Sequence, residues 1–147
     1  MTAPLEGVIR GDVASLVAAT AELEEYLARA AVGAEATYAC TLALEEVVTN
    51  VFKYGHSGGE PHEVRFQAEV TADHAVLRFS DDGRPFDPLA APPPDLARRP
   101  EDRSIGGLGI HLIKTLADRI DYRRTDGRNL LTAHFALRPV PRQEPLP

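Results

Sequence analysis

The segment Gly106-Gly107-Leu108-Gly109-Ile110-His111-Leu112-Ile113-Lys114 is a glycine-rich turn that continues into apolar residues at helical spacing. Backbone N–H groups aimed from such a helix N-terminus can bind phosphate. The turn lacks the Gly-Lys-Ser/Thr ending of a P-loop, because Ile110 and His111 follow Gly109. Glycine turns also occur in many loops that bind nothing, so the rest of the chain must decide what this one does.

The periodicity on either side of the turn predicts the remaining elements and the fold class. The expected helices are one capped by Asp12, which carries Val13, Leu16, Val17, Leu23, Tyr26 and Leu27 on a core-facing stripe, one over about 34–54, and one from about Gly109 to Asp118. The expected strands are Val8–Ile9, 64–70, 75–80, a strand from Ile120 to the turn at Asp126-Gly127, and 131–137. Two hairpins with helices gathered on one face predict an α+β fold, a two-layer α/β sandwich with a mixed, mostly antiparallel sheet. Because strands and helices do not alternate, the pattern argues against a doubly wound nucleotide fold.

The composition is that of an ordinary single domain. The 147 residues are 44% hydrophobic and 26% charged, and the formal net charge is −6. This acidic balance argues against a broad electrostatic grip on nucleic acid. The apolar runs are too short to span a bilayer, the N-terminus lacks a secretory signal, and the single Cys40 cannot form an internal disulfide. We therefore expect a cytoplasmic protein with one domain over 1–138 and a flexible tail over 139–147.

A long proline-bearing segment precedes the glycine turn. Regular periodicity stops from Asp82 to about Ile105, a stretch that includes Pro92-Pro93-Pro94. A connection of this length inside a compact domain is typical of a functional lid, and a passive insertion is the alternative.

The second expected helix carries a pair of polar residues four positions apart. Glu46 and Asn50 lie within about 40° of each other around the helix axis, whereas Glu45 and Asn50 diverge by about 140°. Glu46 is therefore the better partner for the amide. The alternative is a solvated polar face, which points away from the stripe of Val47, Val48 and Val51.

Asp81 ends the second strand of the first expected hairpin. It continues the alternation of Leu77 and Phe79, which places its carboxylate at the end of the inward face, where an unpaired charge is costly. Gly83 removes side-chain bulk two residues later, so a flat ligand can approach the backbone. An amine on a heterocycle satisfies both features, and an ordinary Asp-Asp-Gly turn is the alternative.

Three segments occur in one chain in a specific order: Leu44-Glu45-Glu46-Val47-Val48-Thr49-Asn50, Asp81-Asp82-Gly83-Arg84-Pro85-Phe86-Asp87-Pro88 and Gly106-Gly107-Leu108-Gly109-Ile110. They resemble the ATP-binding boxes of the GHKL ATPase superfamily, and most of all those of its RsbW-like anti-sigma-factor serine/threonine kinases. The similarity extends from about Val8 to Leu137. It implies the Bergerat ATP-binding fold, with a long lid over ATP between residues 87 and 105.

The resemblance also implies a role for each matching residue. Asn50 would ligate a Mg²⁺ that bridges the ATP phosphates, and Glu46 would orient or deprotonate the attacking hydroxyl. Asp81 would accept from the adenine amine, with Gly83 giving the base room. The remaining implied ATP contacts are the backbone amides of Gly107, Leu108 and Gly109 on the phosphates, and Thr132 beside the adenine-binding aspartate.

The implied reaction is transfer of the γ-phosphoryl group from Mg·ATP to a serine or threonine of a partner protein. Members of this branch bind a sigma factor and phosphorylate a STAS-type anti-sigma antagonist. Many are homodimers, and the sequence itself leaves the oligomeric state open. A second hypothesis is a non-catalytic module that binds its partner under the control of ATP or ADP. A third, the catalytic part of a sensor histidine kinase, is disfavoured because no helical phosphoacceptor domain is expected before the first strand.

Overall fold

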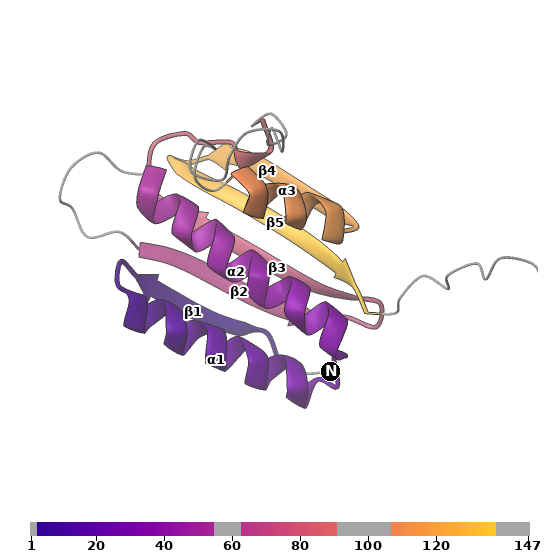
Figure 1. Ribbon diagram of the computed structural model, residues 1–147. Coiled ribbons are helices and arrows are strands. Elements are labelled where there is room, and N and C mark those ends of the chain that lie inside the picture. Colours follow the sequence, from indigo (N-terminus) through magenta and orange to yellow (C-terminus); the bar gives the residue numbers. More distant parts are fainter. Residues whose placement is uncertain (1–2, 55–62, 91–106, 138–147) are drawn as a thin grey trace, which may run out of the picture.

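The computed structural model describes residues 3–54, 63–90 and 107–137. Its elements are β1 (Leu5–Arg10), α1 (Val13–Arg29), α2 (Ala34–Tyr54), β2 (Glu63–Val70), β3 (His74–Asp81), the short 3-10 helix η1 (Pro88–Ala90), α3 (Gly107–Leu116), β4 (Arg119–Thr125) and β5 (Arg128–Ala136). The strands form one sheet in the order β1-β2-β3-β5-β4. The three α-helices lie on one face of this sheet (Figure 1). The predicted α+β two-layer sandwich is confirmed.

Every pair of neighbouring strands in the described sheet is antiparallel. The expectation of a mixed sheet is therefore wrong for this part of the chain. The reason is local for two of the pairs, because β2–β3 and β4–β5 are joined by tight turns, which only antiparallel strands allow. The β4–β5 turn has positive φ at Asp126 (51°) and Gly127 (73°), as a two-residue hairpin turn requires.

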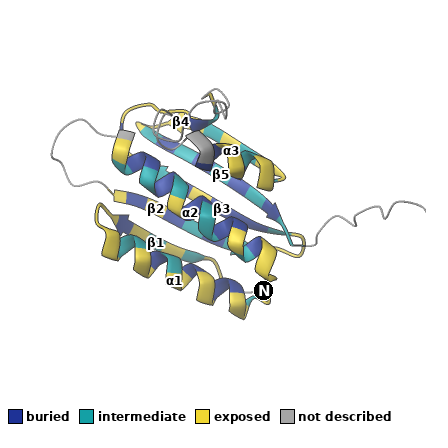
Figure 2. Cartoon of the chain, viewed as in Figure 1, coloured by how far each residue is buried: buried dark blue, intermediate teal, exposed yellow. Residues whose placement is uncertain are grey.

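The core lies between the helices and one face of the sheet (Figure 2). Alternate residues of the strands point into it, as period-2 patterning predicts. The largest fully buried side chains are Phe135, Ile9, Leu23, Leu27, Leu44, Leu77, Ile113, Val48, Val64 and Cys40. Phe79 pairs with Leu131 and Asp81 pairs with Asn129 across β3 and β5, so polar residues end two inward rows of the sheet.

The first helix begins where expected but turns one side of its predicted stripe outward. Asp12 caps α1 by accepting a hydrogen bond from Ser15 N at 2.6 Å. Val13 and Val17 are 78% and 63% exposed, so their expected place in the core is wrong. Val17 is rotated by about 120° around the axis from the fully buried Leu23, which places it outside the face of α1 that meets the core.

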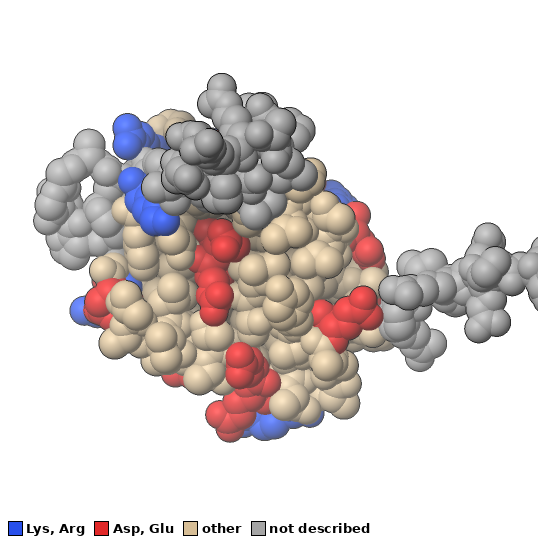
Figure 3. Space-filling model, viewed as in Figure 1, with Lys and Arg blue, Asp and Glu red and all other residues tan. Residues whose placement is uncertain are grey.

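The other face of the sheet carries no helix within the described residues and has a charged surface. It forms an open depression of about 840 Å³ whose lining includes Arg65, Arg78, Arg123 and Thr132. The helix layer carries exposed acidic side chains (Figure 3).

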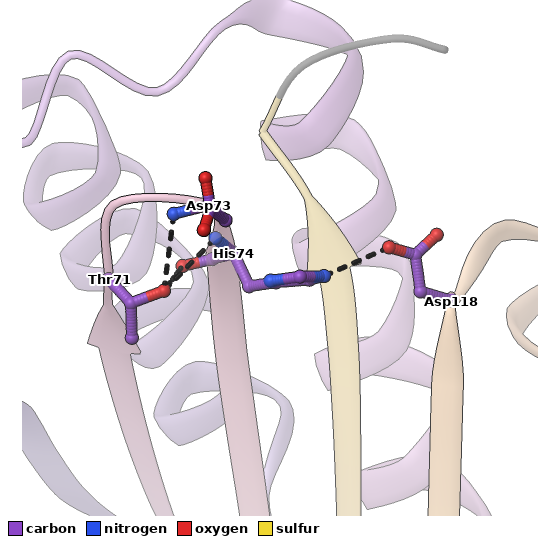
Figure 4. Close-up of polar contacts among 4 residues, drawn as sticks. All are labelled: Thr71, Asp73, His74 and Asp118. Carbon is purple, nitrogen blue, oxygen red and sulfur yellow. Dashed lines mark hydrogen bonds and ion pairs between the residues drawn. The ribbon is translucent and has the colours of Figure 1, made fainter.

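Polar contacts close the end of the sheet that is remote from Asp81 (Figure 4). The β2–β3 turn is held by Thr71, whose Oγ1 accepts from His74 N at 3.1 Å. His74 Nε2 lies 3.0 Å from Asp118 Oδ2, which links the start of β3 to the start of β4.

No described helix is long and apolar enough to cross a membrane.

Cys40 is a buried core residue, as its place in the predicted stripe of α2 indicated. Burial raises the pKa of its thiol from 9.0 to about 12. Between these values the unfolded chain loses the thiol proton while the folded chain keeps it, so the free energy of unfolding falls as pH rises above 9. From pH 8 to 10.5 this group should cost about 2 kcal/mol.

Urea unfolding of the wild type and of Cys40→Ala at these two pH values tests this expectation. The variant is expected to lose about 2 kcal/mol less stability over the alkaline step than the wild type. Parallel losses in the two proteins would mean that the thiol ionises equally in both states.

Candidate functional site

Asp81 lies at the inner end of β3 with only 6% of its surface exposed, which confirms its predicted inward placement. Its Oδ1 accepts two hydrogen bonds, from Gly83 N and from Asn129 Nδ2, each at 3.0 Å. Within the described residues nothing donates to Oδ2. A carboxylate with one oxygen satisfied and the other free can accept a hydrogen bond from a ligand.

A small cavity opens next to this carboxylate. Its walls are mainly apolar, and three polar side chains converge on it; the lining residues are Val47, Asn50, Val51, Phe79, Asp81, Phe86, Pro88, Ile110, Tyr122, Asn129 and Leu131. The open space is about 30 Å³, room for little more than water. A flat ring would have to displace the outer wall, to which Phe86 and Pro88 contribute. The wider depression on the other sheet face lacks such buried convergent groups, so we place the site here.

Asn50 also faces this cavity. It is 5% exposed, so the alternative of a solvated polar face is wrong for this residue. It lies about 60° around the axis from Val47, and α2 covers the sheet at this point, so Asn50 joins the inward side of the helix. Among the described side chains none forms a hydrogen bond with its amide. An unpaired amide in a cavity is available to a ligand or a metal ion.

Glu46, one turn before Asn50, lies against the start of α3. A Cβ on residue 109 would collide with the Glu46 carboxylate and lie 2.7 Å from Glu46 Cγ. Glycine at 109 therefore leaves the space that the Glu46 side chain occupies. This contact and the packing of α2 on α3 bring two of the three segments singled out in the sequence next to each other.

The effect of Gly109→Ala on the free energy of unfolding should therefore change sign when Glu46 is shortened to alanine. In a helix, alanine is favoured over glycine by about 1 kcal/mol. Gly109→Ala should nevertheless lower the free energy of unfolding by about 1–3 kcal/mol, because the methyl group overpacks the contact. In a Glu46→Ala background the same change should be stabilising. Denaturant unfolding of the four proteins in this cycle measures the coupling, and a stabilising Gly109→Ala in the wild-type background would contradict it.

The helix α3 begins at Gly107, two residues earlier than expected. Gly107, Leu108 and Gly109 are thus its first three residues, whose N–H groups have no partner within the helix. These amides and the positive end of the helix dipole can bind an anion. Gly106 of the glycine turn and residues 91–105 of the expected lid lie outside the described residues, as do the loop over 55–62 and the tail over 139–147. Ahead of that gap, Lys114 Nζ donates to Leu89 O at 2.8 Å, which ties η1 to α3.

Asn129 is a site residue for which the sequence analysis gave no role. It is 6% exposed, faces Asp81 across the strands and lines the cavity. Tyr122 and Arg124 of β4 donate to its Oδ1 at 2.5 and 3.2 Å. The alternation that places Leu131, Ala133 and Phe135 inward also includes Asn129, so the argument applied to Asp81 could have found it.

The structure does not bring Thr132 to this site. Thr132 is three residues from Asn129 on β5, an odd number, so its side chain lies on the opposite face of the sheet. It pairs there with Arg78 and Asp121. The implied place of Thr132 beside Asp81 is wrong, and Asn129 occupies it.

These features agree with comparisons to known proteins. The model of the histidine kinase-like ATPase domain matches residues 9–135, and the chain belongs to this family. Within it, the chain is 30% identical over 116 residues to the serine/threonine-protein kinase BtrW of Bordetella bronchiseptica, covering 78% of this chain and 82% of BtrW. It is 30% identical over 111 residues to the serine-protein kinase RsbW of Listeria monocytogenes, covering 73% and 71% of the two chains. The predicted RsbW-like membership of the GHKL superfamily is confirmed.

A solved structure supports the fold. The crystal structure of the RsbU and RsbW domains of Rv1364c from Mycobacterium tuberculosis superposes with a TM-score of 0.64 at 17% identity. The match covers 94% of this chain and 34% of that one, so this chain spans about a third of the larger protein. The fold is therefore that of the GHKL ATPases, and the family uses ATP.

Proposed function

We propose that this chain is a Mg·ATP-dependent serine/threonine protein kinase that binds a sigma factor and phosphorylates a STAS-type anti-sigma antagonist. The observation that carries the catalytic part is Asp81 Oδ2, which accepts no hydrogen bond from a described residue and lies at an apolar cavity that Asn50 also lines. The start of α3 lies against Glu46 of the same helix as Asn50, so base, phosphate and metal sites can be contiguous.

The hydrogen-bonding and apolar groups of adenine match those that line the cavity. Its exocyclic amine can donate to Asp81 Oδ2, which is the kind of polar anchor that orients a ligand in an apolar pocket. Gly83 is buried beside Asp81 and has no side chain to block the ring. Apolar side chains from α2, β3 and α3 supply the faces against which a ring can pack.

The phosphates would extend from this cavity toward α3. The first N–H groups of that helix, from Gly107, Leu108 and Gly109, would donate to phosphate oxygens. Lid residues between 87 and 105 would close over the nucleotide.

The described residues are better suited to a magnesium ion shared between Asn50 and the ATP phosphates than to a metal site built from protein ligands alone. No group of three or more His, Cys, Asp or Glu residues in the described part of the chain could hold a metal ion. Mg²⁺ commonly uses one or two protein oxygens and completes its shell with water and substrate phosphates. When bound, it would neutralise charge on the transferred phosphoryl group. Asn50, whose amide forms no hydrogen bond with a described side chain, would supply a neutral oxygen.

Glu46 would act on the nucleophile. The serine oxygen of the partner forms a bond to the γ-phosphorus, the bond from that phosphorus to the β–γ bridging oxygen breaks, and ADP leaves. Glu46 accepts or positions the hydroxyl proton, a contribution worth about 10²–10⁴ in rate for general bases. The remaining catalysis comes from positioning and charge stabilisation.

The partners in this proposal follow from the family resemblance and from the relatives named RsbW. Phosphorylation of the antagonist would control which of the two proteins the kinase holds. We propose that this exchange takes place in the cytoplasm, with the kinase either alone or as a homodimer.

Incubation of the purified chain with Mg²⁺, [γ-³²P]ATP and a STAS-domain protein from the same genome tests the proposal. We expect acid-stable label on one serine or threonine of the partner, and loss of label when that residue is changed to alanine. Nucleotide-dependent complex formation without label would support the non-catalytic binding module instead. Acid-labile label would indicate phosphohistidine and contradict the proposed kinase class.

A further inference from the structure

The Asn129 side chain uses all of its hydrogen-bonding groups. Its Nδ2 donates to Asp81 Oδ1 at 3.0 Å and to Arg84 O at 2.9 Å. Its Oδ1 accepts from the Tyr122 hydroxyl at 2.5 Å, from Arg124 Nη1 at 3.2 Å and from Phe86 N at 3.4 Å. A fully satisfied buried amide of this kind is rigid.

The donors on Oδ1 determine which way the amide points. If the amide were flipped, its NH₂ group would face Arg124 Nη1 and Phe86 N, which can only donate, and its oxygen would face the Asp81 carboxylate and the Arg84 carbonyl. Four of the five contacts would then be repulsive, and the Tyr122 hydroxyl could accept in place of donating. Arg124 and Phe86 N therefore fix the NH₂ group toward Asp81, and the Tyr122 hydroxyl adds a hydrogen bond to that orientation.

That orientation in turn fixes the Asp81 carboxylate. Oδ1 is held by the amide of Asn129 and by Gly83 N, so Oδ2 is the oxygen left for the cavity. Arg124 Nη1 also donates to Gly83 O at 2.6 Å, which holds the backbone that follows Asp81.

We propose that Asn129, oriented by Arg124 and held by Tyr122, is the positioning residue that makes the site recognise the amino group of the purine. This inference rests on the proposed nucleotide site and adds to it the residue that sets base selectivity. Without Asn129, the Asp81 carboxylate loses one of the two hydrogen bonds on Oδ1 and can rotate away from the cavity. The site then keeps its shape but loses its aligned acceptor.

The test compares ATP with purine riboside triphosphate, in which hydrogen replaces the amino group, by calorimetric titration in Mg²⁺. For the wild type we expect ATP to bind roughly 10- to 150-fold more tightly, as for a hydrogen bond to a charged group. In Asn129→Ala this ratio should fall to about threefold or less, mainly through weaker ATP binding. Tyr122→Phe keeps the ring and removes only one hydrogen bond to Asn129, so it should reduce the ratio less than Asn129→Ala does. It serves as the test variant if Asn129→Ala does not fold.

Thr132→Ala, on the opposite face of the same strand, is the matched control and should leave the ratio unchanged. A general structural defect would weaken both nucleotides equally. Equal weakening in Asn129→Ala and an unchanged ratio in Tyr122→Phe would overturn the inference while leaving the nucleotide site in place. A wild type that binds neither nucleotide would overturn the proposed function and this inference together.

Discussion

Glu46→Gln is expected to reduce phosphoryl transfer to the partner by about 10²–10⁴-fold, because the amide cannot accept the hydroxyl proton. The substitution is isosteric, so it preserves the space against Gly109 that Glu46 fills. ATP affinity should stay within about threefold of the wild type, since the loss is in the transition state. Single-turnover phosphorylation and calorimetric ATP binding measure the two quantities separately.

Glu45→Gln is the matched control for this prediction. Glu45 precedes Glu46 on α2 but is exposed. It has the same charge and the same substitution, so any effect of net charge appears in both variants. Equal transfer rates for the wild type and Glu46→Gln would remove Glu46 from the catalytic role, and a loss of ATP binding in Glu46→Gln would place it in the nucleotide site instead.

Asp81→Asn is expected to weaken ATP binding by roughly 10- to 150-fold, the equivalent of a lost hydrogen bond to a charged group. An asparagine oxygen can still accept from Gly83 N and Asn129 Nδ2 in the place of Oδ1. The NH₂ group then replaces Oδ2 and presents a donor to the donor on adenine. Calorimetric titration with ATP gives the affinity, and thermal unfolding shows whether the fold survives.

Asp82→Asn serves as the control, because Asp82 is adjacent and exposed. It should bind ATP as the wild type does. If Asp81→Asn kept wild-type affinity, the base would have to be recognised elsewhere, and the cavity beside Asp81 would lose its role in the proposed function. A comparable loss in both variants would indicate an effect of charge and not of the Asp81 contact.

Patterns within single elements carried most of the fold prediction. Alternation in β3 placed Asp81 inward, and Asp12, as a capping residue, marked the start of α1. These features depend only on neighbouring residues in the sequence, so they can be predicted without knowing how the elements pack together. The prediction that Val13 and Val17 lie in the core was wrong because their exposure depends on which face of α1 packs against the sheet, and that is decided by tertiary packing.

Contacts between distant segments account for the errors at the site. Side chains alternate between the two faces of the sheet along β5. Once its inward face is known, this alternation places Asn129 at the site and Thr132 on the opposite face. The helix geometry of α2 placed Glu46 and Asn50 near each other around the axis but could not show that Asn50 is buried. That burial depends on β3, β5 and α3, which form the other walls of the cavity.

The sequence by itself determined the element order, the two-layer sandwich and three candidate segments for a nucleotide. Local periodicity, glycine positions and turn chemistry are sufficient for these. Only the tertiary structure decided that Asp81 leaves one oxygen free, that Asn129 holds the other, and that Gly109 makes room for Glu46. The physical reason is that these contacts join residues 48 and 63 positions apart, and their geometry depends on strand register and helix packing.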